Sequence, residues 1–234
     1  MPELSNKTAI ITGGGSGIGK EIARQLANEN TNVVIASRRQ GVLENTAAEL
    51  NAMQKGRVVH VVCDLRSRED ITRTVTAAIE NFGRIDFLVN NSGLGVQKSV
   101  LDCSDEEWDL VLDTNLRGTF LMTREVLPVM IRQRSGYIIN IASQAAKHGY
   151  PQAAPYCASK FGILGFAESL QHEVRDYGIH VHSLCPALVQ VPPPENEAGI
   201  APGVLQVGDL ASTVLFLLKQ PGRVKFEDIG LYHF

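Results

Sequence analysis

Two side chains that could exchange a proton, Tyr156 and Lys160, stand four residues apart in the sequence. On a helix this spacing places both side chains on the same face. An ammonium group beside a phenol favours the phenolate, so we expect Lys160 to lower the pKa of Tyr156 from its usual value of about 10. A tyrosine with such a pKa can act as a general acid or base near neutral pH.

A short Tyr-x-x-x-Lys spacing is a weak signal alone, and a nearby serine strengthens it. Ser143 ends a predicted strand at 138–142, so it should lie at the carboxyl edge of a sheet. Ligands bind at that edge in open α/β sheets. Without its neighbours, Ser143 would be interpreted as an ordinary loop serine.

A glycine-rich turn lies between the first predicted strand and the helix that follows it. Five of the seven residues at 13–19 are glycine, which lets the backbone turn sharply and approach a ligand closely. The helix that starts there directs free N–H groups and a positive dipole end at an anion. The turn therefore predicts a phosphate-binding site.

Two common phosphate-binding patterns fit this turn poorly. Residues 14–20 match the start of a nucleotide triphosphate loop, but Glu21 stands where that loop needs a Ser or Thr for magnesium. The strict dinucleotide pattern Gly-x-Gly-x-x-Gly is also absent, because Ile18 occupies its third glycine position. The turn instead has the pattern TGxxxGxG, made by Thr12, Gly13, Gly17 and Gly19.

The end of the second predicted strand indicates which dinucleotide would bind. An NAD site carries an acidic residue about 20 residues beyond the glycines, where it accepts a hydrogen bond from the ribose 2′-hydroxyl. Here the strand ends in Ser37, Arg38 and Arg39. Two guanidinium groups match a 2′-phosphate, so we predict NADP(H) as the cofactor. The alternative is that both arginines are solvated charges at the start of a helix.

Short apolar runs alternate with longer amphipathic stretches along the chain. Because most of the apolar runs are continuous, they are typical of strands in a parallel sheet covered on both faces. The repeated β-α-β order predicts one α/β domain over 1–234, a Rossmann-type doubly wound sheet of about seven mostly parallel strands. The strands are expected at 8–12, 33–37, 58–63, 85–90, 137–142 and 179–185, and the helices at 17–28, 41–53, 68–82, 105–134, 155–177 and 207–219.

Helix boundaries have their own sequence signals. Ser104 stands three residues before Glu107, as in a capping box, and Pro155 suits a first helical turn. Gly83, Gly136 and Gly178 follow predicted helices, as C-terminal caps do. The one proline-rich stretch opens an irregular segment at 192–206, which we interpret as a substrate loop.

Composition excludes several classes of protein. The chain has 234 residues and a net charge of −3, without the basic balance of a nucleic-acid-binding protein. Its four cysteines are too scattered for a zinc or dithiol motif, and no metal site is predicted. The pair His180 and His182 has no helpful partner elsewhere. With no apolar run long enough to span a bilayer, we expect a soluble, cytoplasmic protein.

The motifs together resemble the short-chain dehydrogenase/reductase family, in its compact single-domain branch, over nearly the whole chain. They follow one another in the family's order, which makes the combination specific although each motif is weak. These are TGxxxGxG at 12–19, Asp64 after the third strand, the sequence Asn-Asn-Ser-Gly at 90–93, Asn115 in a helix, Ser143, and Tyr-x-x-x-Lys at 156–160.

The resemblance implies a mechanism. NADPH would deliver a hydride to a carbonyl carbon, and Tyr156 would donate a proton to the developing alkoxide. Ser143 would hydrogen-bond the carbonyl oxygen. Lys160 would lower the pKa of Tyr156 and bind the nicotinamide ribose. Asn115 would hold a water molecule that links Lys160 to solvent, and Asp64 would contact the adenine. The dinucleotide provides the reducing power, and the protein provides orientation and proton transfer.

The predicted cofactor site gathers the glycine turn, the arginine pair and the segments after later strands. It comprises Gly13, Ser16, Gly17, Ile18, Gly19, Ser37, Arg38, Arg39, Asp64, Leu65, Asn91, Ser92, Gly93, Tyr156, Lys160, Pro186 and Val189. Two positions depart from the family pattern: Ala187 replaces a glycine and Val191 a threonine. Nicotinamide binding would then rest on the backbone near Val189.

The expected substrate is a small carbonyl compound, with a 3-oxoacyl thioester as one candidate because the chain resembles 3-oxoacyl-[acyl-carrier-protein] reductases. Fold-level likeness does not fix the substrate. An NADP-dependent alcohol, sugar or steroid dehydrogenase and a catalytically silent dinucleotide-binding protein are the alternatives. Tyr150 and His148 could contact the substrate or be ordinary loop residues. The resemblance also implies a homodimer or homotetramer built on the long helices at 105–134 and 155–177, and no nucleic-acid or membrane partner.

Overall fold

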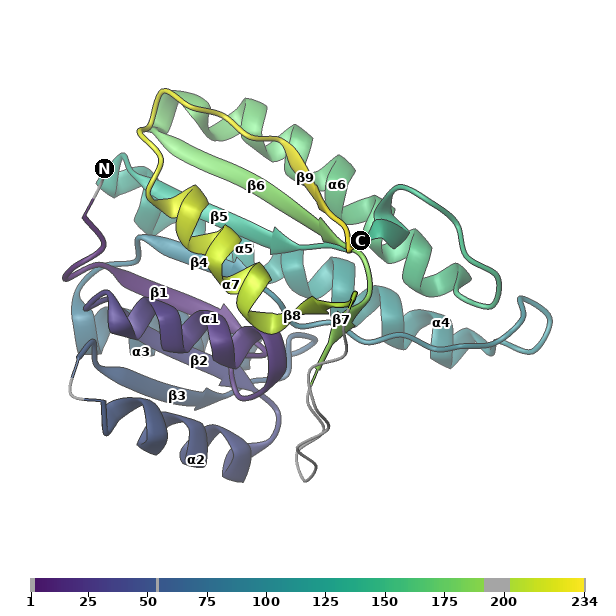
Figure 1. Cartoon of the computed structure of the whole chain (residues 1–234), viewed down its shortest axis with the longest axis horizontal. Coiled ribbons are helices and arrows are strands. Elements are labelled where there is room, and N and C mark those ends of the chain that lie inside the picture. Colours follow the sequence, from purple (N-terminus) through teal and green to yellow (C-terminus); the bar gives the residue numbers. More distant parts are fainter. Residues whose placement is uncertain (1–2, 54, 192–202, 234) are drawn as a thin grey trace.

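A computed structural model describes residues 3–53, 55–191 and 203–233 (Figure 1). Its centre is a sheet of seven parallel strands in one domain, in the order β3-β2-β1-β4-β5-β6-β9. The doubly wound α/β fold predicted from the sequence is therefore confirmed. The strands are β1 (Thr8–Thr12), β2 (Asn32–Ser37), β3 (Val58–Val62), β4 (Phe87–Asn90), β5 (Gly136–Ile141), β6 (Ile179–Pro186) and β9 (Asp228–Leu231).

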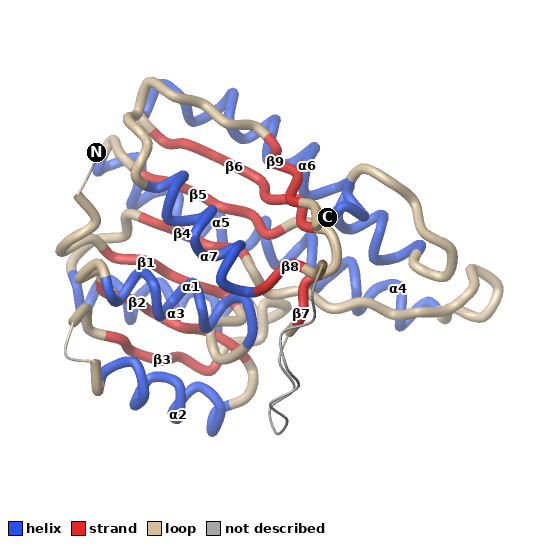
Figure 2. The backbone as a smooth tube through the Cα atoms, viewed as in Figure 1, coloured by secondary structure: helices blue, strands red, loops and turns tan. Residues whose placement is uncertain are grey.

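Helices cover both faces of the sheet (Figures 1 and 2). On one face, α1, α2 and α7 pack on side chains such as Ile11 and Ile35. On the other, α3, α5 and α6 pack on Ile10, Val34 and Ile138. Both faces being buried explains why the strands are continuous apolar runs. The helices are α1 (Gly17–Asn28), α2 (Gln40–Asn51), α3 (Arg68–Phe82), α4 (Asp105–Leu112), α5 (Gly118–Gln133), α6 (Ala154–Val174) and α7 (Val207–Leu218).

The strand order reverses at β1, which pairs with β2 on one side and β4 on the other. The carboxyl ends of β1 and β4 therefore diverge into separate connections at one edge of the sheet. In open α/β sheets this point is where ligands bind. The glycine turn at 13–19 leaves β1 at this point.

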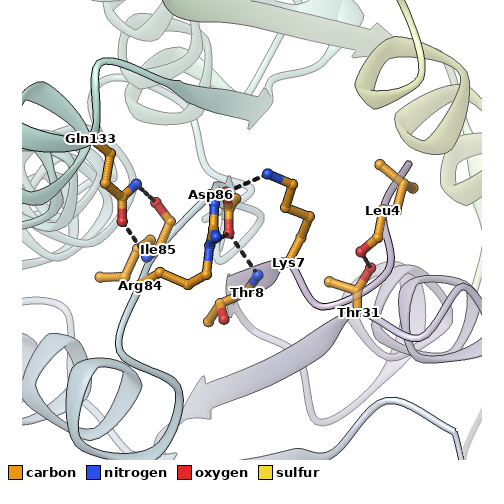
Figure 3. Close-up of polar contacts among 8 residues, drawn as sticks. All are labelled: Leu4, Lys7, Thr8, Thr31, Arg84, Ile85, Asp86 and Gln133. Carbon is orange, nitrogen blue, oxygen red and sulfur yellow. Dashed lines mark hydrogen bonds and ion pairs between the residues drawn. The ribbon is translucent and has the colours of Figure 1, made fainter. Parts of the chain in front are cut away.

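At the opposite end of the strands, where β1 and β4 begin, several contacts meet at the carboxylate of Asp86 (Figure 3). Its side chain is 3% exposed. Asp86 accepts hydrogen bonds from the backbone N–H of Thr8, at 3.0 Å, and from the Arg84 guanidinium, at 2.6 and 2.7 Å. Lys7 adds an ion pair at 3.3 Å. Nearby, the Gln133 amide bonds both the N–H and the C=O of Ile85. These contacts join the start of β1 to the start of β4 and to the end of α5.

The seventh strand lies where the sequence showed no strand. β9 is an edge strand whose residues alternate between exposed and partly exposed, so it lacks the apolar run of the other strands. It pairs with β6, with Ser183 opposite Asp228 and Pro186 opposite Leu231.

The predicted irregular segment at 192–206 is only partly within the described residues, since 192–202 lie outside them. Its last two residues correct the prediction. Leu205–Gln206 form the strand β8, which pairs in parallel with β7 (Val189–Gln190). The prediction of a substrate loop at 192–202 stays a prediction.

Helix ends follow the sequence signals with one exception. Ser104 and Glu107 form the predicted capping box, and Gly83 and Gly178 adopt the left-handed conformation of C-caps, with φ of 74° and 68°. Gly136 does not cap a helix. Arg134 takes that place with φ 51°, while Gly136 begins β5 against Met130, where a Cβ would lie 2.5 Å from Sδ.

The long helix predicted at 105–134 is continuous, but its middle is wider than an α-helix. Residues Asp113–Arg117 form one π-helical turn between α4 and α5. Such turns insert an extra residue and are frequent at functional sites. Asn115, which the sequence singled out, lies in this turn and is fully buried.

Candidate active site

The glycine turn adopts backbone conformations that other residues rarely reach. Gly13 and Gly17 have φ of 68° and 53°. Gly19 is constrained by space rather than by φ, because a Cβ there would lie 2.4 Å from the carbonyl oxygen of Gly13 and 2.6 Å from Asn91 Nδ2. The glycines thus let α1 begin directly against the turn, and the first N–H groups of α1 remain available to a ligand.

The turn is fastened to the end of β4 by Thr12 and Asn91. The Thr12 hydroxyl accepts hydrogen bonds from the N–H groups of Asn91 and Ser92, at 2.9 and 3.0 Å. In return, the Asn91 amide donates to the carbonyl oxygen of Thr12 at 2.9 Å. These bonds fix the position of the glycine turn after β1 relative to the segment that follows β4.

A cavity of about 280 Å³ opens between these two segments and the end of β3. Ten of the predicted cofactor-binding residues line it, from the glycine turn and from the ends of three strands. They are Gly13, Ser16, Ser37, Arg38, Arg39, Asp64, Leu65, Asn91, Ser92 and Gly93.

Three lining residues were missed by the sequence analysis: Cys63, Leu94 and Thr114. Each is the direct sequence neighbour of a predicted site residue, and this neighbourhood was the only signal in the sequence that could have identified it. The Thr114 hydroxyl is buried and has no hydrogen-bond partner among the described residues. A buried polar group without a partner is rare in proteins, and this one lies at the wall of the cavity.

The two arginines flank the cavity and are both exposed. Arg39 donates a hydrogen bond to the Ser16 hydroxyl at 3.0 Å, so its guanidinium lies over the glycine turn. Arg39 is also the residue immediately before α2. A cation at a helix N-terminus opposes the helix dipole, so this position does not favour an arginine for the helix's own stability.

Asp64, predicted to contact adenine, lies at the cavity wall in a close ion pair with Arg66 at 2.6 Å. Hydrogen bonds from Arg66 are the main reason that the pKa of Asp64 lies below its ordinary value. Its carboxylate therefore stays charged while it faces the cavity.

Lys160 is buried, with 3% of its surface exposed, and its ammonium donates a hydrogen bond to the carbonyl oxygen of Ile141 at 2.8 Å. Burial lowers the pKa of Lys160 to about 8. Its Nζ lies 5.6 Å from the centre of the Tyr156 ring. The helix α6 brings both residues to one face, as their spacing predicted.

Tyr156 differs from the expectation in its acidity. Burial raises its pKa above the ordinary value, and a side-chain hydrogen bond with Ser143 works in the opposite direction. The expected lowering by Lys160 is not found, and the lysine ammonium is bonded to the Ile141 carbonyl oxygen. The structure does bring Tyr156 and Ser143 together, at the carboxyl edge where Ser143 was predicted.

Asn115 connects the π-helical turn to the segment after β4. Its side-chain oxygen accepts a hydrogen bond from the N–H of Leu94 at 2.9 Å, and its amide donates to the Leu94 carbonyl oxygen at 2.8 Å. The amide also donates to the Ser159 hydroxyl at 3.0 Å. A Cβ at Gly93 would lie 3.5 Å from both Asn115 Oδ1 and Lys160 Nζ. Asn115, Gly93 and Lys160 therefore meet at one point.

A second cavity of about 580 Å³ has its wall from Gly95 onward, directly after Leu94 of the first cavity. Tyr156 and Tyr150 line this cavity, whereas His148 is not among its lining residues. The remaining wall is largely apolar, with Gly95, Val96, Gln97, Pro151 and Ala153.

Several predicted cofactor residues lie outside the first cavity's wall: Gly17, Ile18, Gly19, Tyr156, Lys160, Pro186 and Val189. The segment after β6 nevertheless reaches the glycine turn. A Cβ at Gly17 would lie 3.1 Å from Val191 Cγ1. Val189 pairs with Leu205 between β7 and β8.

The histidine pair lies in an aromatic stack away from both cavities. His180 stacks on Tyr137, with ring centres 4.8 Å apart, and His182 Nδ1 is 2.5 Å from the carbonyl oxygen of Phe226. Within residues 3–53, 55–191 and 203–233, no three His, Cys, Asp or Glu side chains gather as metal ligands would. Over the same residues, no helix has both the length and the apolar character needed to cross a membrane.

Comparison with known proteins agrees with this arrangement. Residues 7–198 match the family model described as short chain dehydrogenase. An uncharacterized oxidoreductase of Staphylococcus saprophyticus is 33% identical over 229 residues, covering 98% of both chains. A protein of Streptomyces coelicolor, provisionally named a ketoacyl reductase, is 39% identical over 197 residues, covering 82% of this chain and 74% of its own length. Among solved structures, a variant of actinorhodin polyketide ketoreductase with NADPH has a TM-score of 0.89 and 32% identity, covering 99% of this chain and 97% of its own.

Proposed function

Because this chain belongs to the short-chain dehydrogenase family, we propose that it is an NADPH-dependent reductase that converts the carbonyl group of a ketone or aldehyde into an alcohol. One observation carries the proposal: Tyr156 lies next to Ser143 and next to the buried Lys160. Tyr156 also lines the second cavity, whose wall begins at Gly95, directly after Leu94 of the first cavity.

The first cavity fits a phosphorylated dinucleotide. Its wall combines a glycine turn that a single Cβ would obstruct, the two exposed arginines, and the unpartnered Thr114 hydroxyl. The position of Arg39 over Ser16 favours a ligand with an additional phosphate, because a guanidinium pairs closely with such a group. The solved relative with NADPH supports the same dinucleotide class for this chain.

When bound, NADPH supplies the hydride that adds to the carbonyl carbon. The chain's own residues handle the oxygen. Tyr156 donates its phenolic proton to that oxygen, and Ser143 hydrogen-bonds the same atom and keeps it near the phenol. Lys160 lies beside the Tyr156 ring, with its ammonium held by the Ile141 carbonyl oxygen. Asn115 holds the backbone of Leu94, which lines the first cavity.

The second cavity supports an uncharged substrate. Among its seven lining residues none is charged. The two lysines nearest in sequence are both in ion pairs, Lys98 with Glu107 at 2.7 Å and Lys147 with Asp228 at 2.6 Å. Since a carboxylate substrate would need a cationic partner there, we favour a neutral ketone of moderate size, and a 3-oxoacyl thioester is one member of that class.

The test is a spectrophotometric assay of NADPH oxidation over a panel of neutral ketones, aldehydes and 3-oxoacyl thioesters. We expect turnover with at least one compound. Tyr156→Phe should reduce that turnover by about 10³-fold or more, an effect in the range of general acid catalysis, while NADPH binding is retained. Turnover by Tyr156→Phe close to that of the unmodified protein would contradict the role of Tyr156.

Two other functions remain as alternatives that the same assay separates. An NADP-dependent alcohol, sugar or steroid dehydrogenase would reduce NADP⁺ faster than it oxidises NADPH under matched conditions. A catalytically silent dinucleotide-binding protein would bind NADPH tightly and convert no carbonyl compound.

The assembly is proposed to be a homodimer or homotetramer built on α4, α5 and α6. The large apolar side chains Trp108, Phe120 and Phe161 on these helices are 43%, 39% and 48% exposed. A groove of about 350 Å³ runs between α5 and α6 next to Phe120 and Phe166. Exposed large apolar side chains are typical of surfaces that another protein covers.

A further inference from the structure

The position of Ser143 depends on the short turn that follows it. Ser143 precedes one turn of 3₁₀-helix at Gln144–Ala146, and its hydroxyl accepts a hydrogen bond from the N–H of Ala145 at 3.1 Å. The serine itself is in an extended conformation, with φ −176°. Any movement of the turn would therefore move the hydroxyl relative to Tyr156.

Gln144, the first residue of the turn, is 5% exposed and uses both ends of its amide. Its Nε2 donates to the carbonyl oxygen of Cys185 in β6 at 2.6 Å. Its Oε1 accepts a hydrogen bond from the Tyr232 hydroxyl at 3.0 Å. Tyr232 directly follows β9, so the amide joins the turn to two neighbouring strands.

The path of Tyr232 to Gln144 requires a residue without a side chain between them. A Cβ at Gly230 would lie 2.8 Å from Tyr232 Cε2 and 3.4 Å from Gln144 Nε2. Gly230 has no positive φ that would otherwise demand glycine. The space it leaves is filled by the Tyr232 ring, which explains why glycine occupies an interior position of a strand.

The other end of the turn is attached to the same strand. Lys147, which follows the turn, forms an ion pair with Asp228, the first residue of β9, at 2.6 Å. Both members are partly exposed, at 30% and 41% of their side chains, so solvent screens this contact. Strand β9 and the residue after it thus contact the turn at both of its ends.

We propose that Gln144 and Tyr232 are positioning residues that act through Ser143, with strand β9 as their support. This inference rests on the proposed function, in which Ser143 holds the carbonyl oxygen. Tyr232 touches neither of the two cavities described above. Its effect on the reaction is therefore exerted through the turn alone.

A consequence that does not depend on turnover concerns the acidity of Tyr156. Burial raises the pKa of Tyr156, and its interaction with Ser143 works against that rise. Lys160 is the cation that faces the ring, at 5.6 Å. If Tyr232 no longer holds the turn, the Ser143 contact weakens and the pKa of Tyr156 rises.

The experiment compares Tyr232→Phe, which removes only the hydroxyl, with Tyr177→Phe as the matched control. Tyr177 is 38% exposed and lies in the 3₁₀ turn Arg175–Tyr177, after α6. Phenolate absorbance is titrated for each protein with and without Tyr156→Phe, and the difference isolates the titration of Tyr156. Turnover of a ketone and NADPH affinity are measured on the same proteins.

We expect Tyr232→Phe to raise the pKa of Tyr156 and to lower kcat by about threefold to tenfold, the range for one lost hydrogen bond. NADPH affinity and the Tyr177→Phe control should be unchanged. In a Ser143→Ala background, Tyr232→Phe should no longer shift the pKa of Tyr156. A shift of equal size in that background, or no shift in either, would overturn the proposal.

A second variant tests the same inference if Tyr232→Phe does not fold. Asp228→Asn, which leaves Tyr232 in place, should shift the pKa of Tyr156 in the same direction by a smaller amount. If no carbonyl compound is reduced, the proposed function fails, yet the phenolate titration still decides whether β9 positions Ser143.

Discussion

Lys160 destabilises the folded protein while it serves the proposed reaction. Its ammonium is removed from water and has one protein acceptor, the Ile141 carbonyl oxygen. A buried ammonium is costly unless it is paired with an opposite charge, and the lowered pKa of about 8 expresses that cost. Active sites commonly retain such destabilising groups because function needs them.

Replacing Lys160 with methionine should therefore stabilise the fold at pH 7 while abolishing turnover. The difference between pKa values of about 8 and 10.5 corresponds to roughly 3 kcal/mol against the folded state, partly offset by about 1 kcal/mol for the unpaired Ile141 carbonyl. We expect Lys160→Met to raise the free energy of unfolding, measured with urea, by about 1–2 kcal/mol.

The same variant gives a pH dependence with a defined sign. Between pH 8 and 10.5 the unfolded chain holds a proton on Lys160 that the folded chain has lost, so the stability of the unmodified protein rises with pH. The advantage of Lys160→Met should be full below pH 8 and should shrink as the pH rises to 10.5. An advantage that stays constant over this range would contradict the lowered pKa.

The arginine pair leads to a prediction about cofactor choice. Arg39→Ala removes the guanidinium that lies over Ser16, so it should weaken NADPH binding by about tenfold or more, as expected for a lost charge-assisted hydrogen bond. NADH binding should change by less than about twofold. Fluorescence titration with both dinucleotides measures this, with Arg175→Ala as the control at an exposed site beside Asp176. Equal losses for both dinucleotides would remove the assignment to NADPH.

Residue types and spacing were sufficient to predict which groups come together, because Tyr156 and Lys160 share a helical face whatever surrounds them. The sequence was insufficient for the acidity of Tyr156. That pKa depends on how deeply segments remote in sequence bury the phenol, and on the lysine's contact with Ile141. Burial is a property of the folded chain and has no local signature.

Among the elements, the π-helical turn at Asp113–Arg117 does the most to shape the proposed site. It places Asn115 so that one side chain contacts both backbone groups of Leu94 and the Ser159 hydroxyl. The sequence predicted a helix over this region but not the extra residue in its turn, since a π-turn has no characteristic composition. The seventh strand was missed for a related reason, because an exposed edge strand carries no apolar run.

Removing the Asn115 side chain should destabilise the protein as well as reduce turnover. Asn115→Ala leaves the N–H and C=O of Leu94 without their partners, which costs about 2–4 kcal/mol in the free energy of unfolding. Asn115→Asp keeps the acceptor for the N–H but places a second oxygen against the Leu94 carbonyl, so it should not restore stability. Asn81→Ala, at an exposed position, should change the free energy of unfolding by less than about 1 kcal/mol when measured in parallel.

For the whole molecule, the exposed aromatic side chains of α4, α5 and α6 predict self-association. Sedimentation velocity should give a mass of two or four chains. Phe120→Glu and Phe161→Glu should shift the distribution toward the single chain, because a charge would be buried in the contact. Leu101→Glu, at a loop position that is 96% exposed, is the matched control and should leave the mass unchanged. A single-chain mass for the unmodified protein would refute the proposed assembly.

The strand order also has a consequence for how the protein reaches its native state. β1 can complete its pairing only after β4 arrives, from 77 or more residues further along the chain, as the contacts of Thr12 with Val89 and Asn91 illustrate. Closing such long loops is slow, because their entropy must be lost before the contacts compensate for it. The glycine turn gains its fixed shape at the same moment. Dinucleotide affinity should therefore appear late in refolding, and cofactor fluorescence would report the closing of the central strands.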